Sequence, residues 1–393
     1  MPIKLIQVQR KLNIGINTIV EFLEKNGHKI DSNPNTRISD EQYALLAKNF
    51  REDIPNKESW HSIKWNNENR SLIIALKTKP FIILSGISGT GKSSKVASIA
   101  RSFCSGDFQY PPNYELIPVK PNWFDSTELL GYISPSTNKY ISTSFTAFIN
   151  KALEDTNTPY FVCLDEMNLA HVEQYFAEIL SIIETRTFNK DQYEAKELSI
   201  GNDSKIRYPL NLYIIGTVNM DDTTFSFSRK VLDRAMVFEN NNIDLHLGLN
   251  IQNKNTNPEK YNPEILLRHN LNYLDAYKKI KERNVIIEFL TLCNNCLDSS
   301  PFKFAYRLRN EVILYCYYNS LTTEKPTNWL IECLDEIVLI KLLPRIEGDR
   351  SRTEKPLKDV KELLMKYNLN KSIKKIDEMI YKLDSFEYTS YWY

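Results

Sequence analysis

One segment constrains this chain of 393 residues more than any other. The apolar run Phe81–Leu84 leads into Gly86–Ser93, which reads GISGTGKS, and a helix-compatible stretch follows from Lys92 to Phe103. A strand, a glycine-rich loop and a helix in this order fit GxxxxGK[ST], the pattern of a phosphate-binding loop. Its glycines let backbone N–H groups turn towards phosphate oxygens, and the positive end of the helix dipole faces the same anion.

We expect this loop to bind a nucleoside triphosphate. Lys92 supplies a positive charge for the β- and γ-phosphates, and the hydroxyl of Ser93 is a ligand for Mg²⁺. The alternative is a glycine-rich turn that matches the pattern by chance, and the flanking strand and helix argue against it. The residues expected to contact the nucleotide are Gly86, Ile87, Ser88, Gly89, Thr90, Gly91, Lys92, Ser93 and Ser94.

Two further apolar runs end in polar residues that suit the same chemistry. Tyr160–Leu164 is followed by Asp165, expected to hold Mg²⁺, and by Glu166, expected to polarise the attacking water. A later run ends at Asn219, which would orient water or contact the γ-phosphate. The carboxyl ends of parallel strands face one crevice, so these residues should lie together. The alternatives are a solvated strand end for the carboxylates and a turn-capping role for the Asn.

Several arginines are candidates for contacts with the transferred phosphate. Arg234 is the expected arginine finger, which would reach the γ-phosphate of a neighbouring subunit in a ring, and Arg229 and Lys230 are alternatives. A surface salt bridge is the competing interpretation for each. Arg307 opens a helical pattern further along the chain and is expected to close over phosphates bound by the same subunit, with Arg309 as runner-up.

Short apolar runs alternate with helical patterns, such as Val172–Glu184, between residues 80 and 240. This alternation predicts an α/β fold with a parallel sheet. The strand candidates are Phe81–Ser85, Glu115–Val119, Tyr160–Leu164 and Leu210–Val218. The predicted organisation is a small three-helix module at 1–52, a polar linker at 53–72, a P-loop domain at 73–245 and an α-helical lid at 246–393.

Composition excludes several classes of protein. The 50 basic and 49 acidic residues nearly cancel, which argues against a globally basic nucleic-acid binder. No apolar run is long enough to span a bilayer, and the first residues do not resemble a signal peptide, so we expect a cytoplasmic protein with no membrane partner. The pair Cys293 and Cys296 has the spacing of half a zinc site, but cysteines on one helical face are the favoured interpretation. The aromatic tail Tyr388–Tyr393 is expected to pack on the lid, and partner docking is the alternative.

The N-terminal stretch Gly15–Leu46 resembles the small N-terminal module of bacterial translation initiation factor two. Within it, Asn17 is a predicted N-cap, and Ser39–Gln42 reads as a capping box that opens a third helix. The GTPase domain of that factor does not follow in the same form. We therefore interpret the segment as a borrowed module.

From about residue 75 to the end, the chain resembles the McrB-like AAA+ proteins, in the MoxR and dynein-related branch. The segments that carry this resemblance are Gly86–Ser93, Leu164–Ala170, Gly216–Asp222 and Lys230–Ala235. The resemblance implies a ring, typically a hexamer, that hydrolyses a nucleotide and activates a separate nuclease of the McrC type, with DNA reached through that partner. By matched position it assigns the P-loop pair to Lys92 and Ser93, the carboxylates to Asp165 and Glu166, the first sensor to Asn219, the finger to Arg234 and the second sensor to Arg307.

The sequence departs from the founding members of that family at three points. The sensor reads Val-Asn-Met-Asp from Val218, where the GTP-using founders have Asn-Thr-Ala-Asp. Residue 171 is His, where many relatives have Arg. The large domain that reads modified DNA in the founders is absent. We therefore favour ATP over GTP. The alternatives to a restriction motor are a MoxR-like remodelling chaperone ATPase and a ribosome-associated binding protein.

Overall fold

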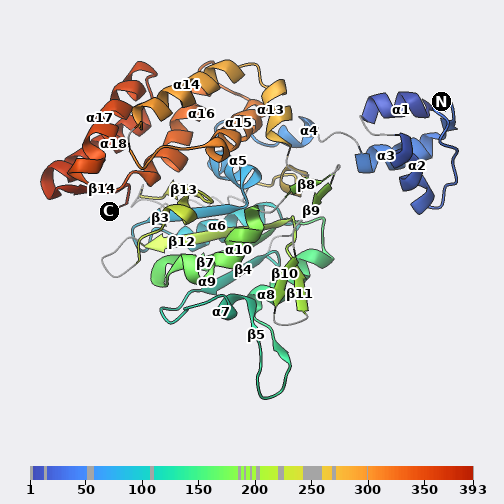
Figure 1. Ribbon diagram of the computed structural model, residues 1–393, viewed down its shortest axis with the longest axis horizontal. Coiled ribbons are helices and arrows are strands. Elements are labelled where there is room, and N and C mark those ends of the chain that lie inside the picture. The colour runs from blue at the N-terminus through green and yellow to red at the C-terminus, as the bar shows by residue number, and fades with distance from the viewer. Residues whose placement is uncertain are drawn as a thin grey trace, which may run out of the picture. The chain divides into compact units, whose positions relative to one another are not determined.

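The computed structural model divides the chain into two compact units, the first of which is the N-terminal module, up to Lys57 (Figure 1). The second unit contains nearly all of the remaining chain. The structure describes residues 3–12, 16–50, 57–106, 110–184, 187–189, 192–194, 197–200, 204–219, 225–241, 259–267, 271–298 and 300–392.

The N-terminal module is built from three short helices, α1 (Leu5–Leu12), α2 (Ile16–Lys25) and α3 (Asp40–Phe50). The capping box predicted at the start of α3 is present: the Gln42 amide donates to Ser39 Oγ at 3.1 Å, and the Ser39 amide donates to Gln42 Oε1 at 2.9 Å. The predicted cap at Asn17 is wrong, because α2 already begins one residue earlier. The module has a core of its own, formed by Leu5, Val8, Ile19, Val20, Leu23, Ile38 and Leu46.

The second unit is organised around a five-stranded parallel sheet with the strand order β13-β3-β12-β7-β4. This confirms the predicted α/β fold class. The strands are β3 (Phe81–Gly86), β4 (Tyr114–Pro118), β7 (Tyr160–Asp165), β12 (Leu212–Asn219) and β13 (Met236–Glu239). The sequence interpretation located all of them except β13, a short strand at the edge of the sheet.

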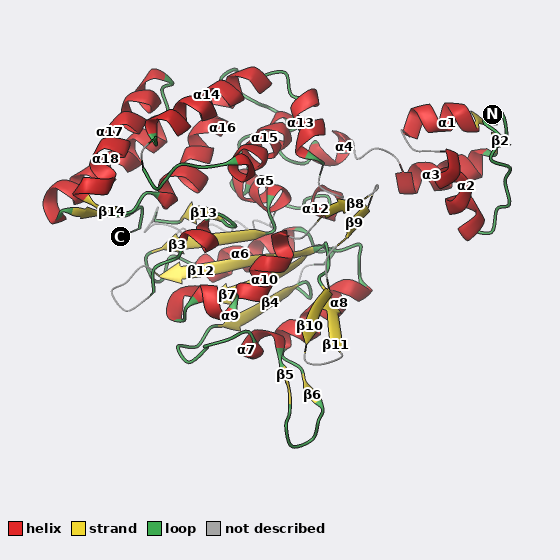
Figure 2. Cartoon of the chain, in the orientation of Figure 1, coloured by secondary structure: helices red, strands yellow, loops and turns green. Residues whose placement is uncertain are grey.

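Helices cover the sheet, which explains why β3 and β12 are almost continuously apolar (Figure 2). Helix α6 (Lys92–Ser102) follows the P-loop, and α8 (Ser144–Glu154) packs near β4. The predicted helix at 172–184 is divided into α9 (Val172–Tyr175) and α10 (Ala177–Glu184). Between β4 and α8, the antiparallel hairpin of β5 (Tyr132–Ile133) and β6 (Tyr140–Ile141) extends away from the sheet (Figure 2).

The stretch 58–72 is part of the second unit and not the polar linker that its composition predicts. Trp60 is buried and stacks on Tyr318 with 5.3 Å between ring centroids. Trp65 is also buried, and its indole N–H donates to Glu332 Oε2 at 3.0 Å. The polar sequence around these two aromatic anchors conceals that they fill the core, and helix α5 (Arg70–Thr78) begins directly afterwards.

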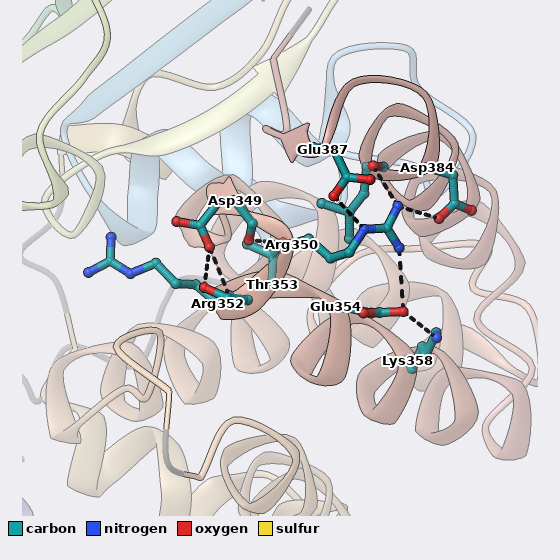
Figure 3. Close-up of polar contacts among 10 residues, drawn as sticks. Asp349, Arg350, Arg352, Thr353, Glu354, Lys358, Asp384 and Glu387 are labelled. Carbon is teal, nitrogen blue, oxygen red and sulfur yellow. Dashed lines mark hydrogen bonds and ion pairs between the residues drawn. The ribbon is translucent and has the colours of Figure 1, made fainter.

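Beyond residue 263, the described chain is mainly helical, and we call this region the lid. Its two long final helices are joined at their ends by Arg350, which forms ion pairs with Glu354 (3.5 Å), Asp384 (3.1 Å) and Glu387 (2.7 Å) (Figure 3). Asp349 accepts a hydrogen bond from the Arg352 amide and so caps the first of them. The main helices are α13 (Tyr273–Lys279), α14 (Arg283–Cys296), α15 (Tyr306–Ser320), α16 (Trp329–Ile337), α17 (Arg350–Lys366) and α18 (Asn370–Phe386).

A buried cluster of charged residues joins the lid to the amino edge of the sheet. Glu311 of α15 binds Lys79 directly before β3 and lies 2.8 Å from the ammonium of Lys341. The same ammonium donates to the carbonyl oxygens of Asp233 (3.1 Å) and Ala235 (2.8 Å), directly before β13. Burial lowers the pKa of Lys341 to about 8, and Glu311 opposes that shift. One carboxylate thus compensates two buried ammonium groups.

The end of the chain packs back onto the folded unit. Tyr391 and Trp392 are buried, and Lys382 of α18 donates to the Trp392 carbonyl at 2.7 Å. The Trp392 ring also contacts Phe227 of the sheet domain, with centroids 5.8 Å apart. Packing on the lid is therefore confirmed for these two residues. Within the described parts of the chain, no helix combines the length and the apolar character needed to cross a membrane.

Because Glu311 compensates two buried cations, its replacement should destabilise the fold strongly. We expect Glu311→Gln to lower the free energy of unfolding by about 3–5 kcal/mol, since two ammonium groups would remain buried without a counter-charge. Urea denaturation followed by circular dichroism measures the change. Glu354→Gln, which removes surface ion pairs with Lys358 and Arg350, is the matched control. It should leave the midpoint nearly unchanged, because both pairs lie on the surface and Arg350 keeps its contacts with Asp384 and Glu387. Equal urea midpoints for the two variants would contradict the proposal that Glu311 compensates the two buried ammonium groups.

Candidate nucleotide site

The predicted phosphate loop lies between β3 and α6 at the carboxyl edge of the sheet. Lys92, the first residue of α6, is buried, and its ammonium donates to the carbonyl oxygens of Gly86 (2.9 Å) and Ile87 (2.8 Å). Burial lowers the pKa of Lys92, whereas Asp165 and Glu166 act in the opposite direction. The cation is therefore held inside the loop and next to both predicted carboxylates.

Asp165 is the centre of the hydrogen-bond network at the end of β7. Its Oδ1 accepts from the hydroxyl of Ser93 at 2.6 Å and from the hydroxyl of Thr217 at 2.6 Å. The Thr217 Oγ1 in turn accepts from the backbone amide of Glu166 at 3.0 Å. The sequence analysis did not identify Thr217, although its position in β12, two residues before the predicted sensor, was a usable signal. Thr217 therefore holds the carboxylate of Asp165 and the backbone of Glu166 in place.

The predicted water-activating residue adopts an unusual backbone conformation. Glu166 has φ +52° and ψ +50°, in the left-handed region that residues other than glycine rarely occupy. Its Oε1 accepts from the side-chain amide of Asn219 at 2.8 Å, and the side-chain amide of Asn168 donates to the backbone carbonyl of Asn219 at 3.0 Å. Strained residues persist only where their surroundings hold them, and they gather at functional sites. The structure thus brings the predicted base and the predicted sensor into direct contact.

The oxygen ligands at this site fit a magnesium ion. The Ser93 hydroxyl and the Asp165 carboxylate are one hydrogen bond apart, and oxygen is the ligand type that Mg²⁺ takes. Among the described residues, no group of three or more His, Cys, Asp or Glu side chains could hold a metal by itself. The residues that are present suit an ion that keeps several waters and also binds phosphate oxygens.

Two asparagines after β13 hold both ends of the phosphate loop, and the sequence interpretation did not include them. The Asn240 side chain donates to the Thr90 carbonyl at 3.2 Å, and Asn241 Oδ1 accepts from the Ile87 amide at 3.2 Å. A Cβ atom at Gly86 would lie 2.6 Å from the Asn240 carbonyl oxygen, so only glycine fits there. No motif marks these residues, because they follow the edge strand that the sequence analysis also missed.

A cleft of about 630 Å³ lies between the end of β13 and the lid. Asn241, which contacts the phosphate loop, lines one part of it. Its volume is within the range of small-molecule sites, about 300–1,000 Å³. The other lining residues include Ser71, Phe238, Glu239, Ile340 and Lys375.

The arginine candidates gather around Asp233. Arg234 follows the short helix α11 (Arg229–Leu232) and is partly buried, and Arg345 of the lid forms an ion pair with Asp233 at 3.0 Å. Burial lowers the pKa of Arg345, and the nearby Arg229 and Arg307 shift it in the same direction. The predicted finger region and the predicted lid arginine therefore lie in one basic cluster.

This basic cluster is at the amino edge of the sheet, opposite the phosphate loop. Helix α15 binds both ends of α5: Asn319 contacts Arg70 at its start, and Glu311 contacts Lys79 just beyond its end. Arg307 lies one turn further along α15, past the Lys79 contact, on the side where β3 begins. In this structure Arg307 thus lies with Arg345 in the basic cluster, and its expected closure over bound phosphates stays a prediction. Helix periodicity could not show which edge of the sheet the lid would cover.

Comparison with known proteins agrees with this geometry. Residues 81–237 match a family model described as an AAA domain of the dynein-related subfamily, and residues 263–388 match one described as a domain of unknown function. The second unit contains an AAA+ ATPase domain. The matched AAA+ segment begins at the first residue of β3 and ends within β13, so it includes the phosphate loop, both carboxylates and Asn219.

The N-terminal module is similar to a different class of protein. Over 58 residues it is 72% identical to translation initiation factor IF-2 of Parabacteroides distasonis, and over 53 residues it is 55% identical to that of Bacteroides fragilis. These matches cover 15% and 14% of this chain but only 6% and 5% of the factors. The AAA+ domain lies outside them.

A solved structure from Cytophaga hutchinsonii, described provisionally as an ATPase, is also similar. It is 14% identical, and the match covers 73% of this chain and 84% of that chain with a TM-score of 0.47.

The position of Thr217 leads to a prediction for the AAA+ domain. Thr217→Val keeps the shape but removes the hydroxyl that connects Asp165 with the Glu166 amide. We expect nucleotide hydrolysis, measured as kcat/KM by phosphate release, to fall about 30-fold, because two hydrogen bonds of roughly 1 kcal/mol each are lost. Thr217→Ser retains the hydroxyl and should stay close to the parent. Loss of activity in the Ser variant as well would show that the methyl group, and not the hydroxyl, is required.

Proposed function

We propose that the AAA+ domain hydrolyses a nucleoside triphosphate with Mg²⁺, that ATP is preferred over GTP, and that the protein is the ring-forming motor subunit of a McrBC-like restriction or anti-phage system. The observation that supports hydrolysis best is the connected set Lys92, Ser93, Asp165, Glu166 and Asn219 at one edge of the sheet. The motor assignment rests on the resemblance of the motifs to McrB-like proteins and on the matching AAA domain.

Each side chain of the set has a specific task in this mechanism. The Lys92 ammonium exchanges its carbonyl contacts for β- and γ-phosphate oxygens, and Ser93 with Asp165 holds the metal. Mg²⁺ supplies charge neutralisation across the phosphates when bound. Glu166 orients the attacking water and takes its proton, and Asn219 keeps the Glu166 carboxylate in position.

The location of the arginines favours a shared site between subunits. Arg234 and Arg307 lie near the amino edge of the sheet, whereas the phosphate loop is at the carboxyl edge. An arginine so placed meets the phosphates of a neighbouring subunit more readily than those of its own. We infer a closed ring, with six subunits as the resemblance implies, in which both arginines act across the interface.

The cleft beside Asn241 is the proposed place for the nucleoside. It begins where Asn241 contacts the phosphate loop, and it combines apolar walls at Phe238 and Ile340 with polar groups at Glu239 and Asn241. The preference for ATP is supported by the AAA family match and by the sensor sequence, which lacks the Asn-Thr-Ala-Asp motif of the GTP-using family founders.

The proposed partner is a separate nuclease of the McrC type. A gene for such a nuclease next to that for this chain supports the defence role, whereas a neighbouring von Willebrand A-type protein supports a MoxR-like chaperone. The deciding experiment is a plaque assay on cells that express the chain with the nuclease, compared with cells that carry Lys92→Ala. Equal plaque numbers across a broad phage panel would reject the defence role.

A second candidate function concerns the N-terminal module. Its 72% identity to an initiation factor over 58 residues is far more than is required by the seven buried core residues among those that the structure describes. Retention of the surface favours retention of a binding partner, so we propose that this module associates with ribosomes. Sedimentation with purified ribosomes, with the isolated factor module as competitor, tests the idea; a protein that stays in the supernatant at low salt would reject it.

Two substitutions separate binding from hydrolysis. Lys92→Ala should abolish tight nucleotide binding, because it removes the cation held inside the loop. Glu166→Gln should bind normally but lower kcat about 100-fold or more, since an amide cannot accept the proton from water. Phosphate release from ATP and from GTP, with and without DNA, measures both effects and the base preference. Turnover by the Gln variant at the parent rate would show that another residue activates the water.

The shared site predicts complementation between inactive variants. Arg234→Ala should bind nucleotide normally yet lose about 10³-fold in kcat, because the finger acts on the neighbouring site. In rings mixed with Glu166→Gln subunits, an Arg234→Ala subunit retains Glu166 and can receive Arg234 from its neighbour, so partial activity should return. If mixing restores nothing while the parent is active as a monomer, the shared-site mechanism is wrong.

A further inference from the structure

A buried lysine of the lid contacts the end of the edge strand β13. Lys375 of α18 is 5% exposed, and its ammonium lies 2.7 Å from Glu239 Oε1. The same ammonium lies over the ring of Tyr391, 4.6 Å from its centroid, and 3.4 Å from the more exposed Glu378. Burial of a lysine is costly unless the charge is compensated, so this position is closely defined by its surroundings.

From Glu239 the contacts continue to the phosphate loop. The Asn241 side-chain amide donates to the same Oε1 of Glu239, and the Asn241 Oδ1 accepts from the Ile87 amide at 3.2 Å. Three polar contacts thus join the last helix of the lid to the residue that follows Gly86. Lys375, Glu239 and Asn241 all line the cleft proposed for the nucleoside.

The orientation of Asn241 is the critical element. An Asn side chain has a donor end and an acceptor end, and only one orientation lets it donate to Glu239 and accept from Ile87 together. Lys375 fixes the carboxylate that selects this orientation. Without Lys375, the carboxylate is free to turn towards solvent in the cleft, and Asn241 loses the group that aligns it.

We propose that Lys375 is a positioning residue, through which the helical lid sets the nucleotide affinity of the phosphate loop by way of Glu239 and Asn241. The inference rests on the proposed nucleotide binding and extends it to control by the lid. A loop that is already ordered binds with a smaller entropic cost, so loss of the contact weakens binding. Coupling of this kind is reciprocal: a bound nucleotide also holds the lid more firmly on β13.

The test compares Lys375→Met with Lys382→Met. Lys382 is a half-buried lysine of the same helix that donates to the Trp392 carbonyl, and its charge also acts on Glu239. It therefore serves as a control for the loss of one positive charge near Glu239, because Lys375→Met in addition removes the 2.7 Å contact with the carboxylate. We expect Lys375→Met to raise the Kd for an N-methylanthraniloyl-labelled ADP about tenfold, equivalent to about 1.4 kcal/mol, and KM by a similar factor with little change in kcat. Lys375→Arg should recover most of the affinity, and Lys382→Met should bind like the parent.

Hydrogen–deuterium exchange gives a readout that is independent of activity. Without nucleotide, the peptide containing Ile87 should exchange faster in Lys375→Met than in the parent. Its exchange rate in Lys382→Met should equal that of the parent. Asn241→Ala, at a less buried position, should reproduce the effect even if Lys375→Met folds poorly. The double variant Asn241→Ala/Lys375→Met should bind about as weakly as the worse single variant, because both act through one contact path.

Three results would overturn the proposal: parent-like affinity and exchange in Lys375→Met, an equal loss of affinity in Lys382→Met, or strictly additive losses in the double variant. If the parent itself binds no nucleotide, the proposed function fails, and the exchange of the Ile87 peptide alone decides whether the lid positions the loop.

Discussion

The placement of the lid depends on the compensation of Lys79 and Lys341 by one carboxylate, Glu311. This cluster connects α15 of the lid with the residues that begin both β3 and β13. Charges that are removed from water tolerate few alternative arrangements, because each alternative leaves one of them uncompensated. The cluster therefore defines how the helices of the lid are oriented relative to the strands.

From this joint the lid reaches both edges of the sheet. At the amino edge it contributes Arg307 and Arg345 to the basic cluster around Asp233. At the carboxyl edge it contributes Lys375, which contacts Glu239 at the end of the same strand β13. One helical domain thus takes part in the proposed intersubunit surface and in the proposed support of its own phosphate loop. Nucleotide-dependent movement at one edge would be transmitted to the other through a single packed body.

The parts of the site that the sequence predicts are those that are contiguous along the chain. Lys92 and Ser93 sit in a motif with fixed spacing, and Asp165, Glu166 and Asn219 directly follow apolar strands, so pattern and chemistry indicate them together. Their arrangement at one edge follows from the parallel sheet, since the ends of neighbouring parallel strands meet.

What the sequence does not predict depends on contacts between distant segments. Asn240 and Asn241 follow a strand of four residues, too short for a clear alternating pattern, and they gain their importance only where the loop passes beside them. The burial of Trp60 depends on Tyr318, more than 250 residues later in the chain. The position of Arg307 depends on ion pairs of the lid, which no local pattern contains.

The backbone of Glu166 has a consequence for how this domain evolves. A left-handed conformation is easiest for glycine or asparagine, and a glutamate held there stores strain on the order of 1–3 kcal/mol. A glycine at this position would relieve that strain and stabilise the fold while it removed the carboxylate. Selection for a stable fold and selection for catalytic turnover therefore act in opposite directions on the codon for residue 166. In homologous proteins that no longer need turnover, we expect this glutamate to be among the first residues to be replaced.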